Sequence, residues 1–224
     1  MSLFEMSFVP KLSILPEAQR AVWNELNQVP RRFVLYGGTA LALRLGHRQS
    51  EDFDFFADAP VHPEELLHGL TLIKDASIRQ NAPNTLTVIV DRGGPVKLSF
   101  FGLTRRRVSN PETTNDGAVR VASLLDIAAF KMAVLPARAE AKDYLDVFAL
   151  LRSGIALGDA LGAAQAVYGE QFNPILTLKA LTYFNDGDLP TLSKDVQQTL
   201  RAAAVVEHIA HFEPLLGGLV PPEK

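Results

Sequence analysis

The amino-acid sequence predicts an α+β protein, in which an N-terminal lobe with a mixed β-sheet and flanking helices precedes a C-terminal helical bundle. Residues 1–120 alternate segments with helical and strand periodicity. From about Val121 onward, alanine and leucine become frequent and β-branched runs become rare. The 224 residues are 47% hydrophobic and 21% charged, a composition sufficient for a buried core. We therefore expect two domains, 1–120 and 121–224.

The N-terminal lobe is expected to combine short helices with a sheet. Helices are predicted where apolar residues recur every three or four positions, and strands where they alternate or form short buried runs. The sequence Arg92-Gly93-Gly94-Pro95 indicates a hairpin between the last two strands. The predicted helices are 16–29, 39–45 and 63–70, and the predicted strands are 33–36, 52–56, 77–81, 85–91 and 96–101.

The C-terminal lobe is expected to be entirely helical. Pro136 ends the first of its helices and Ser153-Gly154 ends the second. The predicted helices are 122–135, 138–151, 157–168, 174–183 and 194–212.

Composition excludes several classes of function. The chain contains no cysteine, so a disulfide scaffold, a thiolate zinc site and a cysteine nucleophile are excluded. Its net charge of −3 argues against sequence-specific DNA binding. The N-terminus does not resemble a signal peptide, and no apolar run is long enough to span a membrane. We expect a cytoplasmic protein without membrane contact.

Two carboxylates, Asp52 and Asp54, are the first candidate functional residues. They alternate with Phe53 and Phe55, so on a strand both acids share one face and both rings share the other. Adjacent carboxylates repel each other, and a divalent cation keeps both ionised. Oxygen ligands suit Mg²⁺ or Mn²⁺ better than zinc. A solvated strand edge is the alternative, and it is favoured when the pattern is taken alone.

A glycine pair forms the second candidate element. Gly37-Gly38 lies between a predicted strand and a predicted helix, where backbone N–H groups and the helix dipole favour a phosphate group. Thr39 could cap the helix or bond a phosphate oxygen. An ordinary strand-to-helix turn is the alternative. Together with the nearby Asp-x-Asp, however, the turn supplies what nucleotidyl transfer needs: a site for a triphosphate and a site for its metal.

The stretch LYGGTALALRLGHRQSEDFDFF resembles the DNA polymerase β-like nucleotidyltransferase superfamily, and more narrowly the AbiEii-type abortive-infection toxins. The resemblance continues through Lys131 in AAFKMAV, through ARAEAKDYLDVFALL, and into LKALTYFNDGD at 178–188. It implies a nucleotidyltransferase fold and activity, with Mg²⁺ or Mn²⁺ as cofactor and an NTP as substrate. It also implies an RNA acceptor, such as tRNA, or a protein acceptor, and a cognate antitoxin.

The charged residues of these blocks have candidate roles within that resemblance. Lys131 or Lys142 could neutralise a triphosphate oxygen during transfer. Asp143 and Asp146 could orient that lysine or contact the nucleotide. A surface ion pair between Lys142 and Asp146 is the alternative. In the loop before the Asp-x-Asp, the two residues expected to contribute to nucleotide binding are Arg48, which could face phosphate, and Ser50, which could bond the loop backbone.

One position departs from the expected pattern. Polymerase-like transferases usually carry a third carboxylate on a neighbouring strand, where it binds metal and acts as a base. Here Ser99 stands at that place, on the strand face that also carries Lys97. Asp91, the nearest acid, resembles a hairpin residue. The sequence thus predicts a metal-dependent enzyme that transfers an NMP to an acceptor hydroxyl, and leaves two alternatives: an inactive nucleotide-binding module and an antibiotic-modifying transferase.

Overall fold

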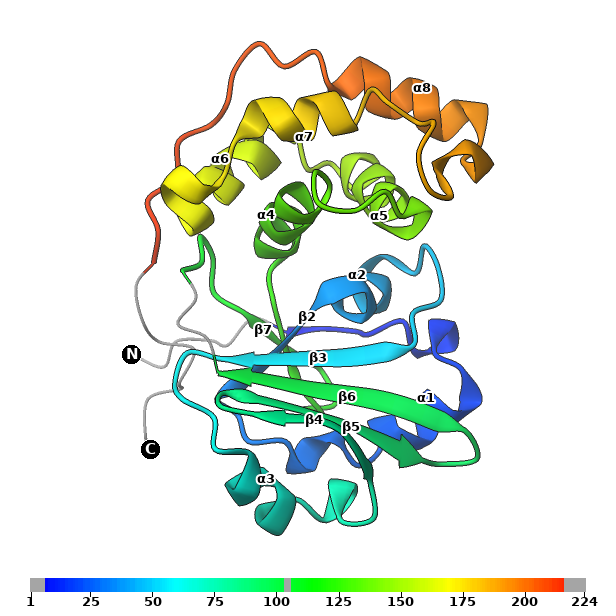
Figure 1. Cartoon of the computed structure of the whole chain (residues 1–224), viewed down its shortest axis with the longest axis vertical. Coiled ribbons are helices and arrows are strands. Elements are labelled where there is room, and N and C mark those ends of the chain that lie inside the picture. Colours follow the sequence, from blue (N-terminus) through cyan, green and yellow to red (C-terminus); the bar gives the residue numbers. More distant parts are fainter. Residues whose placement is uncertain (1–6, 103–105, 216–224) are drawn as a thin grey trace. The chain divides into compact units, whose positions relative to one another are not determined.

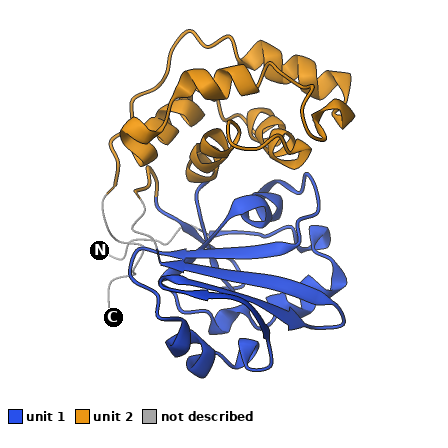
Figure 2. Cartoon of the chain, in the orientation of Figure 1, with its two compact units in different colours: residues 1–105, 110–123, 217–224 blue, residues 106–109, 124–216 orange. Residues whose placement is uncertain are grey.

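The computed structural model describes residues 7–102 and 106–215, which form two compact units (Figure 1, Figure 2). Unit 1 comprises residues 7–102 and 110–123 of the described chain, and unit 2 comprises 106–109 and 124–215. Unit 1 contains the sheet and unit 2 is helical, so the α+β class predicted from the sequence is confirmed.

The sheet of unit 1 is mixed, and its strand order in the described chain is β1-β7-β8-β2-β3-β6-β5-β4. Parallel pairing joins β3 to β6, and antiparallel pairing joins β3 to β2 and β5 to β6. The strands are β1 (Ser7–Phe8), β2 (Phe33–Tyr36), β3 (Asp52–Ala57), β4 (Ser77–Ala82), β5 (Thr85–Asp91), β6 (Pro95–Gly102), β7 (Glu112–Thr114) and β8 (Arg120–Val121).

Helices cover both faces of this sheet: α2 lies on one side, and α1 and α3 lie on the other (Figure 1). The helices of unit 1 are α1 (Glu17–Trp23), α2 (Gly37–Leu45) and α3 (Pro63–Gly69), with short 3₁₀ segments at Leu12–Ile14, Leu26–Gln28 and Thr71–Ile73. Gly46, at φ +70°, ends α2 in the left-handed conformation that glycine adopts without strain.

Aromatic side chains form the core beneath the central strands. Phe55 stacks on Phe100 with ring centroids 5.4 Å apart, and Phe33 meets Phe100 edge-on at 5.3 Å. Phe53 and Phe55 are buried, whereas Asp52 and Asp54 on the same strand are half-buried. Strand alternation therefore separates the apolar core from the candidate site, as the sequence predicted.

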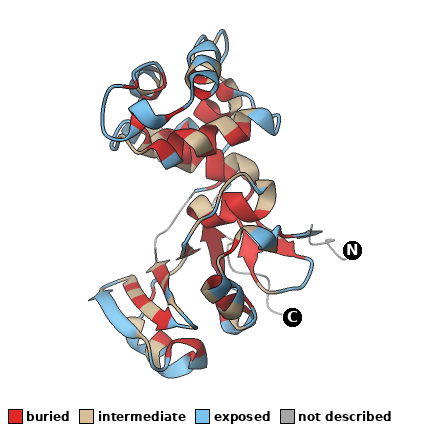
Figure 3. Cartoon of the chain, turned by 90° about the vertical axis from the view of Figure 1, so that its right-hand side faces the viewer, coloured by how far each residue is buried: buried red, intermediate tan, exposed pale blue. Residues whose placement is uncertain are grey.

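Unit 2 consists of helices with buried inner faces and exposed loops (Figure 3). Two of its helices begin with a side-chain cap: Asn173 accepts from the N–H of Ile175, and Ser193 accepts from the N–H of Val196. The helices are α4 (Leu124–Val134), α5 (Ala141–Arg152), α6 (Leu157–Tyr168), α7 (Pro174–Ala180) and α8 (Lys194–Ala203), with 3₁₀ segments at Gly169–Gln171 and Leu189–Thr191.

Some of the predicted helix boundaries are wrong, and the sheet contains short strands that were not predicted. The helix expected over 16–29 stops at Trp23 and resumes only as a 3₁₀ turn. The last helix ends at Ala203, well before the predicted 212. The short strands β1, β7 and β8 were not predicted, since pairs and triplets of residues carry no readable periodicity.

No single helix within residues 7–102 and 106–215 is long and apolar enough to cross a membrane. Ala141–Arg152 and Leu157–Gln171 reach that length only together, with a bend of 116° between them.

Candidate functional site

The glycine turn and the Asp-x-Asp lie next to each other in unit 1. Antiparallel pairing of β2 with β3 places Tyr36 opposite Asp54, and α2 begins at the next residue, Gly37. Gly37 has φ +77°, and a methyl group on it would lie 3.3 Å from Oδ2 of Asp54. The backbone that opens α2 thus directly adjoins this carboxylate, in a conformation that favours glycine.

The next glycine has an equally close environment. A methyl group on Gly38 would lie 2.5 Å from Nη2 of Arg48 and 3.0 Å from Oγ of Ser50. Arg48 also donates to the Gln49 carbonyl at 2.8 Å. The structure therefore brings Arg48 and Ser50 to the first turn of α2, which no side chain of the described residues caps. A guanidinium and uncapped N–H groups at a helix N-terminus are together suited to an anion.

Thr39 connects this turn to the strand that carries the aspartates. Its hydroxyl donates to the Asp52 carbonyl at 2.5 Å and is hydrogen-bonded to the Ser50 hydroxyl at 2.9 Å. The residue is almost completely buried. Its side chain therefore holds α2 against β3, which leaves the backbone N–H as the group it can offer to a phosphate.

Asp52 forms an ion pair with Lys97, which lies on the neighbouring strand β6. Parallel pairing puts Lys97 of β6 beside Asp52, and its Nζ lies 2.7 Å from Oδ2. The hydrogen bond to Asp52 raises the pKa of Lys97, with a further contribution from the charge of Asp54. Both members of the pair are partly exposed, so a competing cation has access to the Asp52 carboxylate.

The two aspartates supply the carboxylate ligands that suit a magnesium-type ion. Mg²⁺ is commonly held by one or two carboxylates together with substrate phosphates and water. Asp52 and Asp54 share a strand face, and the Lys97 ammonium shows that a cation is stable beside them. Within residues 7–102 and 106–215, no group of three or more His, Cys, Asp or Glu side chains is placed to hold a metal.

Ser99 occupies the position at which a third carboxylate was expected. It pairs with Asp54 in the β3–β6 register and is buried. Asp91, the nearest alternative in sequence, accepts the N–H groups of Gly93 and Gly94 at 3.0 Å each. It therefore shapes the β5–β6 hairpin, as its sequence context predicted.

The second group of predicted residues forms an ion cluster inside unit 2. Nζ of Lys131 lies 2.7 Å from Oδ1 of Asp143 and 2.5 Å from Oδ2 of Asp146. Arg138 adds two further hydrogen bonds to Asp143, at 2.7 and 3.1 Å. Both aspartate side chains are 0% exposed and that of Lys131 is 3% exposed. Two cations thus compensate two carboxylates that are removed from water.

Lys142 lies outside this cluster. Its side chain is 57% exposed, and its Nζ is 2.8 Å from a Glu140 carboxylate oxygen. The surface pair of Lys142 with Asp146, considered as an alternative from the sequence, is wrong because Asp146 is buried and bonded to Lys131. A pair as exposed as that of Lys142 and Glu140 contributes little to stability, so Lys142 can be released to a ligand.

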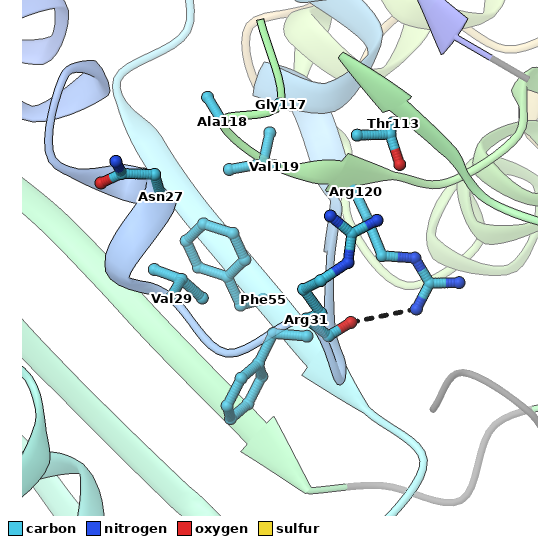
Figure 4. Close-up of a pocket in the computed structure, with 10 residues that line it drawn as sticks. Asn27, Val29, Arg31, Phe55, Thr113, Gly117, Ala118, Val119 and Arg120 are labelled. Carbon is cyan, nitrogen blue, oxygen red and sulfur yellow. Dashed lines mark hydrogen bonds between the residues drawn. The ribbon is translucent and has the colours of Figure 1, made fainter. Parts of the chain in front are cut away.

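A small cavity of about 120 Å³ elsewhere in unit 1 does not belong to the candidate site (Figure 4). It is lined by Phe55, whose side chain points to the opposite face of β3 from Asp54, and by the β7–β8 region. Arg120 donates to the Arg31 carbonyl at 3.0 Å beside it. Neither Asp52 nor Asp54 contributes to its lining.

Comparison with known proteins identifies the family. A sequence model described as "Nucleotidyl transferase AbiEii toxin, Type IV TA system" matches residues 23–217. The chain belongs to this family. It is also similar to an uncharacterized protein of Aquifex aeolicus, with 31% identity over 159 residues that cover 69% of this chain and 74% of the relative. The resemblance to AbiEii toxins inferred from the sequence motifs is confirmed, and the protein is a nucleotidyltransferase of the AbiEii family.

Solved structures of low sequence identity share the fold of this AbiEii protein. MenT4, a nucleotidyltransferase toxin of Mycobacterium tuberculosis, superimposes with a TM-score of 0.58 at 16% identity, covering 84% of this chain and 80% of MenT4. A putative nucleotidyltransferase from Helicobacter pylori gives a TM-score of 0.53 at 19% identity, covering 83% and 89% of the two chains. The nucleotidyltransferase-like fold expected from the motifs is thus confirmed.

Two residues of the site were missed as candidates in the sequence. Lys97 was placed on the face of Ser99, but only the parallel β3–β6 register reveals its bond to Asp52. Arg138 belonged to the second sequence block without an assigned role, and it contacts Asp143 across the turn before α5. A basic residue near a candidate carboxylate is the signal that could have indicated both Lys97 and Arg138.

Proposed function

We propose that this AbiEii protein transfers an NMP from an NTP to a hydroxyl group of an RNA or protein acceptor, and that the reaction depends on a divalent metal. It would act in the cytoplasm, as the toxin of a toxin–antitoxin or phage-defence pair. The observation that carries the proposal is the contact between the glycine turn and Asp54. A phosphate-binding turn beside a metal-binding carboxylate is what a triphosphate–metal complex requires.

Asp52 and Asp54 would hold Mg²⁺ or Mn²⁺. When bound, the ion would neutralise charge on the triphosphate and favour attack on its α-phosphorus. Lys97 would have to leave Asp52 as the ion binds, and its partly exposed side chain permits that movement.

The first turn of α2 would bind the triphosphate. Gly37, Gly38 and Thr39 offer backbone N–H groups, and the absence of a Cβ on either glycine allows a phosphate to approach the chain closely. The Arg48 guanidinium adds positive charge at the same turn, and Ser50 fixes the loop that carries it. These groups orient the substrate without taking part in bond making.

The remaining candidate residues lie in unit 2. We assign to the exposed Lys142 the stabilisation of charge on the departing pyrophosphate. Lys131 would act by holding Asp143 and Asp146 in place, because its ammonium is already engaged by both carboxylates. Asp143 and Asp146, which the sequence assigned to nucleotide binding, would contribute by fixing the first turn of α5, where Lys142 also lies.

The reaction balances as a single displacement. The acceptor oxygen forms a bond to the α-phosphorus, the bond between the α-phosphorus and the bridging oxygen to the β-phosphate breaks, and pyrophosphate leaves with that electron pair. The acceptor proton passes to a carboxylate, for which we propose Asp54, since Ser99 cannot serve as a base.

The proposal is tested with NTPs that carry label in either the α- or the γ-phosphate. Each is incubated with the protein, Mg²⁺ or Mn²⁺, and cellular RNA or protein. We expect α-label on the acceptor and γ-label in pyrophosphate. Label transfer from the γ-position to the acceptor would show phosphoryl transfer and contradict the proposal, as would the absence of any transfer.

A second candidate function is an inactive nucleotide-binding module, and the position of Ser99 favours it. A serine stands beside Asp54 where a base and metal ligand would be expected. This candidate predicts metal-dependent NTP binding without a labelled product. Ser99→Asp should then increase the affinity for divalent metal. Unchanged affinity in that variant would show that position 99 does not face the metal ligands.

A further inference from the structure

A pocket of about 520 Å³ lies entirely within unit 2 and has no role in the function proposed above. Its lining comes from the α4–α5 connection around Pro136, from Tyr144 of α5, from α7 with the residues that follow it, and from the segment 186–189. Its volume falls in the range of roughly 300–1,000 Å³ that is typical of small-molecule sites. The lining includes Lys179, Ala180, Tyr183 and Asp186, which belong to the sequence segment 178–188.

Specific contacts build this pocket. Asp188 accepts the N–H of Ala141 at 2.6 Å and so joins the segment 186–189 to the start of α5. Gly187, at φ +54°, packs so closely on the Ala139 carbonyl that a methyl group would lie 2.2 Å from its oxygen. On the other side, the Tyr144 hydroxyl donates to the Ala180 carbonyl at 3.2 Å. The walls are therefore fixed by hydrogen bonds and by a glycine contact.

Two large apolar residues of the pocket lining are half exposed to water. Tyr183 is 51% exposed and Leu176 is 50% exposed, although both are large and apolar. Leu176 and Ala180 follow each other at helical spacing on α7, and the N–H of Tyr183 bonds the Ala180 carbonyl just beyond the helix. The three residues thus form one side of the pocket, with an aromatic ring open to a ligand.

Charged groups also line the pocket. Lys179 and Arg138 contribute two cations to the lining, and Asp186 contributes a carboxylate. The guanidinium of Arg138 is bonded to the buried Asp143 on one side, yet 41% of its side chain is exposed. Arg138 therefore connects the pocket to the ion cluster of Lys131, Asp143 and Asp146.

We infer that this pocket binds one unpaired nucleotide of an RNA acceptor. The Tyr183 ring stacks on the base, Lys179 and Arg138 bind the flanking phosphates, and Asp186 accepts a hydrogen bond from a base amino group. An aromatic face combined with cations is the recognition chemistry of single-stranded nucleic acid. The inference rests on the proposed function, because it names RNA as the acceptor class.

RNA binding measured without catalysis tests this inference. Fluorescence anisotropy is recorded with a labelled single-stranded RNA oligonucleotide at fixed salt, with unlabelled tRNA as competitor. The variants are Tyr183→Ala, which removes the ring, and Tyr183→Phe, which keeps it. Ile175→Ala is the matched control, since Ile175 is an apolar residue of α7 that is 59% exposed and lies outside the pocket lining. Melting temperatures establish that all variants fold.

We expect Tyr183→Ala to weaken RNA binding at least about fivefold, and Tyr183→Phe and Ile175→Ala to change it less than twofold. In transfer assays, the KM for RNA should rise in Tyr183→Ala while the KM for NTP stays constant. Equal RNA affinity of Tyr183→Ala and the wild type would overturn the inference. So would an effect on the KM for NTP alone, which would assign the pocket to the substrate base.

Failure of this inference is distinguishable from failure of the proposed function. If the wild type binds no RNA but transfers α-label to a protein, nucleotidyl transfer stands and the pocket assignment is wrong. If the wild type binds RNA through Tyr183 but transfers no label to any acceptor, the pocket assignment stands and the proposed reaction is wrong.

Discussion

Replacement of Lys131 by methionine should severely destabilise unit 2. Its ammonium contacts two carboxylates at 2.7 and 2.5 Å, and both carboxylates are completely buried. Methionine preserves most of the side-chain volume, so the substitution removes the charge and leaves little cavity. Asp143 keeps Arg138 as a partner, but the cluster loses one of its two positive charges. Breaking a buried pair in this way costs about 3–5 kcal/mol.

Urea denaturation followed by circular dichroism measures this loss. With an m-value of about 2–3 kcal/mol/M, the unfolding midpoint of Lys131→Met should fall by roughly 1–2 M. Lys142→Met is the control, since Lys142 is 57% exposed and bonded only at the surface, and its midpoint should change by less than about 0.3 M. Adding Asp146→Asn to Lys131→Met should recover part of the loss, because it removes the uncompensated carboxylate.

A loss of less than about 1 kcal/mol in Lys131→Met would refute this reasoning. It would mean that Asp143 and Asp146 bind their protons or gain water when the lysine is removed. Equal losses in Lys131→Met and Lys142→Met would likewise show that burial does not determine the importance of these lysines.

Two further predictions concern unit 1. Lys97→Met should raise the affinity for Mg²⁺ alone several-fold in titration calorimetry, because the ammonium 2.7 Å from Asp52 competes with the ion, and a lower affinity would contradict that competition. Burial raises the pKa of Asp116, but hydrogen bonds from Thr114 and Trp23 lower it by more than burial raises it. The pKa of Asp116 in the folded protein therefore lies below the model-peptide value of 3.8. The stabilisation by Asp116 is therefore complete above that value and is lost as pH falls through the folded pKa. With unfolding followed by Trp23 fluorescence, Asp116→Asn should lose less stability than the wild type in this acid range. An identical pH dependence of the two proteins would contradict the assignment.

The sequence predicted those parts of the fold that depend on local pattern. Alternation of acid and phenylalanine at 52–55 placed Asp52 and Asp54 on one face of a strand and the rings in the core, and the structure agrees. The hairpin that includes Asp91 was also predicted correctly, because glycine and aspartate have defined roles in tight turns. In both cases the determining contacts lie within a few residues of one another.

Features that depend on distant pairing were not predictable in the same way. The bond between Lys97 and Asp52 follows from parallel pairing of strands that are far apart in sequence. The burial of Lys131 depends on α4 packing beside α5, and helical periodicity alone makes a lysine in that position resemble a surface residue. The short strand β8 forms only because β2 offers it a partner.

The central claim is that Asp52 and Asp54 hold the metal of an NTP site, and thermal unfolding tests it most directly. Wild type and Asp54→Asn are melted without ligand, with Mg²⁺, with NTP, and with both. We predict that the wild-type melting temperature rises by about 5–10 °C only when both are present at roughly 100 times the dissociation constant. Asp54→Asn should melt within about 2 °C of the ligand-free wild type and show no rise. A wild type without a ligand-dependent shift, or a variant that shifts as much as the wild type, would contradict the claim.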